Sequence, residues 1–123
     1  MILNMFDVIL QSKLESIAEH LTAIGKYFTS IKKFEDFHDK PDGQKTFDAI
    51  MMRLQATEET LKQINTKYPD ILEKHSEVKW EKIIRLRDAI SHHHQMLETE
   101  IVFDICSQFV PRLKTTITKM LRE

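Results

Sequence analysis

The sequence predicts an all-α protein, an antiparallel bundle of four to five helices. Apolar residues recur at steps of three and four over most of the chain, which is typical of amphipathic helices that bury one face. Two glycines and three prolines among 123 residues leave long stretches without a helix breaker. Long helices with short connections favour an antiparallel bundle, which we expect to form one domain over residues 1–123.

The first helix is predicted over residues 3–28. The pattern is lost between Ser30 and Gly43, where Phe34 and Phe37 are expected to tuck a connecting turn onto the core. The apolar stripe of this first helix consists of Leu3, Phe6, Leu10, Leu14, Ile17, Leu21, Ile24 and Phe28.

The second helix is predicted from about Gln44 to Lys67. Pro69 follows it closely, as expected of a stop signal, and a short helical turn is expected around Ile71. One acidic residue, Glu58, falls on the apolar stripe between leucines and therefore needs a partner if it is buried.

A third long helix is predicted to begin at Ser76, a plausible N-cap, and to run through Ile90. A loop is expected from His94 to Glu98, followed by a fourth helix from about Thr99. This last helix should bend or restart at Pro111, which removes a helical hydrogen bond.

The charge balance excludes one class of function. The chain has 18 basic and 19 acidic residues, a formal charge of −1, which argues against strong non-specific binding to nucleic acid but not against a local basic cleft. No basic, apolar leader precedes Asp7, and no stretch approaches the ~18 apolar residues of a membrane span. We therefore expect a cytoplasmic protein.

The single cysteine, Cys106, lies in an apolar run and is expected to be a buried, inert thiol rather than a nucleophile. It has no partner for an internal disulfide, which fits a reducing compartment.

The chemically loaded stretch of the sequence runs from Arg87 to His92. Arg87 takes a position on the predicted third helix where a bundle normally places an apolar residue. Either its guanidinium pairs with a core acid such as Glu58 or reaches water, or it faces a cleft or subunit interface and binds a phosphate bidentately.

His92 lies roughly 140° around a helix from Arg87, so the two side chains do not share a face. Asp88 lies four residues before His92 and does share its face. Such an aspartate either fixes the imidazole tautomer, leaving the other nitrogen free to transfer a proton, or forms a surface pair of little consequence.

Metal binding is not favoured by the histidine pattern. Neighbouring histidines at 92–94 point in different directions on a helix, and His20, His38 and His75 are scattered along the chain. No cofactor is predicted.

Taken together, the motif and its flanks resemble the HepT-like branch of the HEPN domains, helical bundles that often act as RNA-cleaving toxins. The central Arg-polar-x3-His pattern is common by chance, but the order and spacing of all the pieces agree over nearly the whole chain. The segments that carry the resemblance are Phe34–Phe37, Arg53–Gln55 with Glu58, Trp80–Ile83, Arg87–His92, Glu100–Ile105 and Val110–Leu113.

The resemblance implies a metal-independent endoribonuclease, the toxin of a toxin–antitoxin module whose antitoxin is a minimal nucleotidyltransferase. It also implies a homodimer in which two copies of the motif build one composite site for RNA. Arg87 and His92 are then the expected catalytic residues, supported by Asp88, Ser91, His94 and Glu58.

Two positions depart from the family's pattern. Asp88 stands where the family usually has asparagine, and the negative charge either weakens RNA binding or raises the His92 pKa. His94 stands where the family has the tyrosine that its antitoxin modifies, and it could act as a second proton carrier or phosphate contact. The alternative function is therefore an inactive helical module that docks a nucleotidyltransferase or RNA without cutting.

Overall fold

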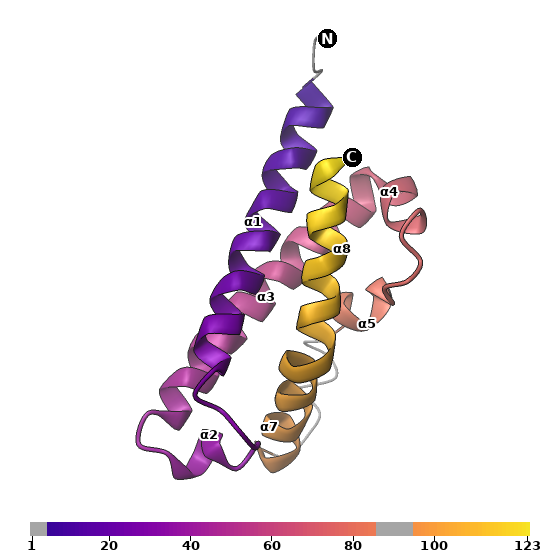
Figure 1. Cartoon of the computed structure of the whole chain (residues 1–123). Helices are drawn as coiled ribbons and strands as arrows, with labels where there is room; N and C mark the ends of the chain where they lie inside the picture. Colours follow the sequence, from indigo (N-terminus) through magenta and orange to yellow (C-terminus); the bar gives the residue numbers. More distant parts are fainter. Residues whose placement is uncertain (1–4, 86–94) are drawn as a thin grey trace.

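A computed structural model describes residues 5–85 and 95–123. Every regular element in these two ranges is a helix, so the predicted all-α class is confirmed (Figure 1). Among the helices of these ranges, none is long and apolar enough to cross a membrane.

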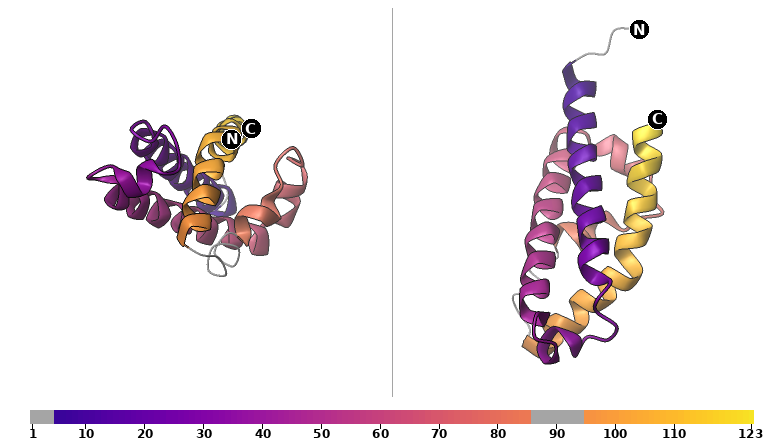
Figure 2. Two further views of the ribbon diagram at one scale, coloured as in Figure 1. Left: turned by 90° about the horizontal axis from the view of Figure 1, so that it is seen from below. Right: turned by 60° about the vertical axis from the view of Figure 1, so that its left-hand side comes forward.

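The two longest helices, α1 (Met5–Phe28) and α3 (Gly43–Lys67), confirm the first two predicted helices. They pack antiparallel along most of their length (Figures 1 and 2). The short α2 (Asp36–Asp39) connects them, and its buried Phe37 meets the ring of Phe47 edge-on at 5.2 Å. Phe37 therefore does tuck the connection onto the core.

The chain then turns at α4 (Pro69–Glu73), the expected short helical turn, into α5 (Trp80–Ile84). Both lie against α3, on the flank of the bundle away from α1 (Figures 1 and 2). The predicted start at Ser76 is wrong, because α5 begins four residues later and Lys79 occupies the N-cap position.

The expected continuous third helix is also wrong in its described part. Arg85 leaves helical geometry (φ −102°, ψ 12°), and its backbone N–H donates to the carbonyl of Glu81 at 3.0 Å. Helix α5 begins at Trp80, which is held by the preceding turn, and its N-cap residue Lys79 makes no side-chain cap hydrogen bond.

The C-terminal arm consists of α7 (Gln95–Asp104), a π-helical turn η1 (Ile105–Phe109) and α8 (Val110–Arg122). The predicted loop is wrong for residues 95–98, which are helical. Gln, Met, Leu and Glu occupy these positions, and all four have high helix propensity. The predicted interruption near Pro111 is confirmed, since the π-turn directly precedes it.

The core lies between α1, α3 and the C-terminal arm, and α8 packs along α1. The predicted apolar stripe of α1 is buried from Leu14 to Ile24. The apolar side chains of the core that are fully buried are Ile17, Leu21, Ile24, Phe37, Ile50, Leu61, Ile64, Val102 and Ile117.

Candidate functional site

The catalytic pair and three supporting residues predicted from sequence lie outside the described residues: Arg87, Asp88, Ser91, His92 and His94. The structure instead describes how the chain is held on either side of them. Helix α5 leads to the segment, and α7 follows it. We call these flanking helices, with the contacts that hold them in place, the frame of the site.

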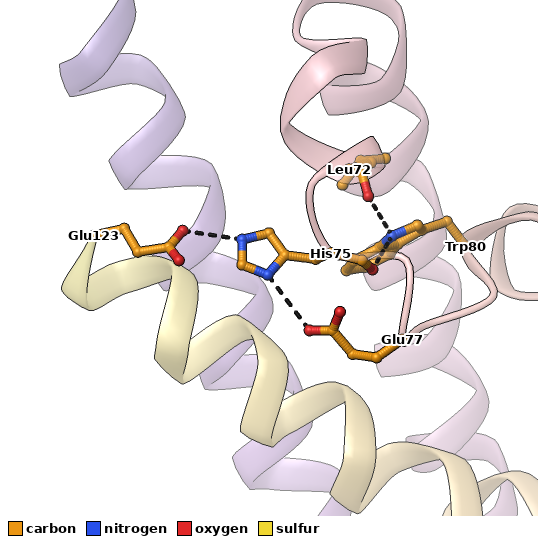
Figure 3. Close-up of polar contacts among 5 residues, drawn as sticks. All are labelled: Leu72, His75, Glu77, Trp80 and Glu123. Atoms are coloured by element: carbon orange, nitrogen blue, oxygen red, sulfur yellow. Dashed lines mark hydrogen bonds and ion pairs between the residues drawn. The ribbon is translucent and has the colours of Figure 1, made fainter.

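Trp80 anchors the chain that leads to the motif. Its side chain is buried, and its indole nitrogen lies 2.9 Å from the carbonyl oxygen of Leu72 and 3.0 Å from that of His75 (Figure 3). The indole N–H thus adds a side-chain donor to two carbonyls of the turn after α4, which also accept the backbone N–H groups of His75 and Val78. The anchor fixes where α5 starts.

His75 ties the same turn to the end of α8. The imidazole is buried, its Nε2 lies 2.9 Å from Oε1 of Glu123, and its Nδ1 lies 3.4 Å from Oε1 of Glu77 (Figure 3). The backbone N–H of Glu77 and then the hydrogen bond from His75 lower the pKa of the Glu77 carboxyl, although desolvation opposes them. The turn before α5 is therefore held from two sides.

Glu58 is the one predicted supporting residue that the structure describes. Its side chain is buried on α3, and its Oε1 lies 2.9 Å from Nζ of Lys62, one turn later, which is half exposed. A buried carboxylate requires compensation, and Lys62 supplies part of it at the protein surface. The expected pairing of Glu58 with Arg87 stays a prediction.

An apolar cavity of about 430 Å³ lies beside the chain that leads to the motif. Its walls come from α3, α5 and the C-terminal arm, and Arg85, the last described residue before the motif, lines it together with Lys82. Charges beside an apolar wall are less screened by water than charges on an open surface. The frame thus combines an apolar surface with two cations and one carboxylate, Glu81.

The three histidines that appear scattered in the sequence each have a distant partner. Nδ1 of His20 lies 3.0 Å from the Arg53 guanidinium, and Nε2 of His38 lies 3.1 Å from the Thr99 hydroxyl. Burial, and then the charge of Arg53, lower the pKa of His20. Its Nδ1 therefore accepts the guanidinium hydrogen bond as a neutral ring.

These pairs were missed in the sequence because 33 residues separate His20 from Arg53 and 48 separate His75 from Glu123. Periodicity along one helix carries no signal for such contacts. A usable hint was the position of Arg53 beside the buried stripe of α3, where a cation needs an acceptor.

Cys106 is a buried thiol, as predicted. Its side chain is 4% exposed within η1, and burial raises its pKa to about 12. Since the thiolate is the reactive form, this cysteine is unsuited to nucleophilic chemistry.

Comparison of this chain with known proteins identifies its family. The family described as "Ribonuclease HepT-like" matches residues 17–120. A Methanocaldococcus jannaschii protein named "Putative RNase MJ0127" is 30% identical over 97 residues, which cover 78% of this chain and 74% of that protein. No solved structure was found to match the chain.

Proposed function

Because this chain belongs to the HepT-like ribonuclease family, we propose that it is a metal-independent endoribonuclease with Arg87 and His92 as its catalytic residues. The observation that carries the proposal is the family match, which spans the motif and both helices that flank it. The M. jannaschii relative named as an RNase supports the same substrate class.

In the proposed chemistry the ribose 2′-oxygen attacks the adjacent phosphorus as the bond to the 5′-oxygen breaks. His92 removes the 2′-hydroxyl proton or donates a proton to the leaving oxygen. Arg87 stabilises the negative charge that develops on the phosphorane. DNA lacks the 2′-hydroxyl and should resist this route.

We further propose that two copies of the chain bring their motifs together as a homodimer, so that each site uses residues from both subunits. Asp88, Ser91 and His94 support the site, and Glu58 contributes from α3. The module we propose is a toxin–antitoxin pair in which a minimal nucleotidyltransferase restrains this chain.

The described frame supports this proposal. The Trp80 anchor and the His75 cluster hold the turn before α5, and a positioned start is what a site needs when small displacements are costly. Lys82 and Arg85, against the single acidic residue Glu81, give the cavity beside the motif a net positive charge, which suits a polyanionic substrate.

The test compares purified wild type with Arg87→Ala and His92→Ala on a labelled RNA and on the matching DNA, all in EDTA. We expect wild type to cleave RNA alone and each variant to lose roughly 10²–10⁴-fold in rate, the usual contribution of a general acid or base. His38→Ala, which changes an exposed histidine bonded to Thr99, serves as the control and should cleave normally.

Absence of cleavage by wild type, or full activity of His92→Ala, would refute the ribonuclease assignment. An inactive wild type that still captures RNA or a nucleotidyltransferase would establish the alternative function, a docking module, with which the departures at Asp88 and His94 are compatible. Light scattering tests the dimer, and a monomer at micromolar concentration would exclude the composite site.

A further inference from the structure

Helix α8 carries a one-signed surface. Its four charged residues are all basic, and no acidic residue occurs between Ile105 and Arg122, although the whole chain has a net charge of −1. All four are exposed. We call them the basic stripe: Arg112, Lys114, Lys119 and Arg122.

The basic stripe lies on the side of α8 opposite the core. At about 100° per residue, Arg122 is directly opposite the centre of the buried face, and the other three cations lie within roughly 80° of it. The stripe extends about 15 Å along the helix axis at 1.5 Å per residue. Lys114, Lys119 and Arg122 line one shallow depression with the hydroxyl residues Thr115 and Thr118, and Glu123 is the one acidic residue in its lining.

The stripe is poorly compensated. Among the described residues, none of its four side chains forms an ion pair within 4 Å. Glu123 borders the depression, but its Oε1 lies 2.9 Å from Nε2 of His75 and it forms no ion pair with a cation of the stripe (Figure 3). The backbone N–H of Glu77 is the main cause of the lowered Glu77 pKa, and the charge of Lys119 adds to it, so Lys119 has a carboxylate nearby without an ion pair.

We propose that the basic stripe is a contact surface for the phosphate backbone of RNA, outside the catalytic motif. The inference rests on the proposed function for the identity of the polyanion, and on the stripe for its location. A near-neutral protein has no overall field that attracts RNA, so binding must come from a local concentration of cations. Lysines, arginines and hydroxyls are the side chains that most often contact phosphates.

The test measures the binding of a single-stranded RNA over a tenfold range of salt, in a His92→Ala background so that no RNA is consumed. Lys114→Gln/Arg122→Gln removes two cations of the stripe. Lys32→Gln/Lys45→Gln removes two exposed cations near the α2 end of the bundle and is the matched control, with the same change in net charge.

We expect the stripe variant to reduce the slope of log affinity against log salt by about 1.4, at about 0.7 per lost contact with single-stranded phosphate. Over that salt range the loss of affinity relative to wild type therefore becomes roughly 25-fold larger at the low-salt end. The control should keep the wild-type slope. Circular dichroism and thermal unfolding check that both double variants are folded.

The proposal is overturned if the stripe variant binds RNA with the same dependence of log affinity on log salt as the control. The same result is expected if the stripe binds an acidic protein instead of RNA. Because the readout is binding, the result is separable from the ribonuclease assignment. If wild type fails to cleave RNA but the stripe variant shows the reduced salt dependence of binding, the ribonuclease assignment is refuted and the proposed RNA contact surface is retained. A cleaving wild type with an unchanged stripe variant refutes the surface alone.

Discussion

The indole nitrogen of Trp80 lies 2.9 Å from the carbonyl oxygen of Leu72, the penultimate residue of α4. The same nitrogen lies 3.0 Å from the His75 carbonyl oxygen, and both contacts span the turn between α4 and α5, together with the backbone hydrogen bonds of that turn (Figure 3). The segment that leads to the motif therefore depends on a donor from a tryptophan rather than on a helix cap.

Trp80→Phe should lower the free energy of unfolding by about 0.5–1.5 kcal/mol, because it keeps an aromatic ring but removes the indole N–H from the Leu72 and His75 carbonyls, which keep their backbone donors. Urea unfolding measures the loss. Ser76→Ala is the control in the same turn and should stay within about 0.5 kcal/mol of wild type. A cost of about 1 kcal/mol for Ser76→Ala would instead indicate that Ser76 caps a helix.

The two glycines should respond oppositely to alanine. A Cβ on Gly43 would lie 2.3 Å from the carbonyl oxygen of Asp36 and 2.6 Å from that of Phe37, whereas a Cβ on Gly25 meets nothing within 4 Å. Gly43→Ala should therefore push α2 away from α3 and destabilise the folded protein by about 1–3 kcal/mol, a size typical of overpacked sites. Gly25→Ala should stabilise by about 0.5–1 kcal/mol, because glycine is unfavourable inside a helix.

Thermal unfolding of both glycine variants tests this pair. Equal effects of the two substitutions would contradict the close approach at Gly43, since helix propensity alone would then account for both.

Asp36 should make stability depend on pH. Its Oδ2 accepts the backbone N–H groups of Lys32 at 2.7 Å and Lys33 at 3.3 Å, and the first of these bonds is the main cause of its lowered pKa. A carboxyl with a lowered pKa in the folded state stabilises the protein above its unfolded pKa of about 3.9, and this contribution is lost as the pH falls through the folded value.

Asp36→Asn should accordingly be less stable than wild type near neutral pH, and the difference should shrink below about pH 4. Denaturant unfolding at a series of pH values measures it. Asp39→Asn, an exposed carboxylate on the same short helix, is the control. A difference that stays constant down to the acid limit would contradict the role of the Asp36 charge.

Cys106 should resist thiol reagents in the folded protein, because its thiol is buried and its pKa is raised to about 12. Labelling with a maleimide, followed by mass spectrometry, should modify it only after denaturant unfolds the chain. Rapid modification in native buffer would show that η1 opens locally, and the protein would then carry an accessible thiol.

The sequence predicted the parts of this fold that depend on periodicity. The stripes of α1 and α3 are long enough to determine both helices within one or two residues at the described ends. It failed where a tertiary contact decides the structure: the Trp80 indole displaces the helix start expected at Ser76. The contacts of His20, His38 and His75 join distant segments and leave no local pattern, and Arg87 and His92 stay predictions.

The π-turn η1 also affects how this sequence should be compared with others. The backbone N–H of Val110 reaches back five residues to the carbonyl of Ile105, one more than in an α-helix, and Pro111 has no N–H to continue the usual ladder. If the same residues continued as an unbroken α-helix, α8 would be rotated by about 100° relative to its present position, and the wide turn absorbs this extra residue instead. A helical wheel drawn through residues 95–122 therefore mixes two phases. An alignment that follows apolar periodicity across η1 will slip by one position, pairing core residues of α8 with members of the basic stripe.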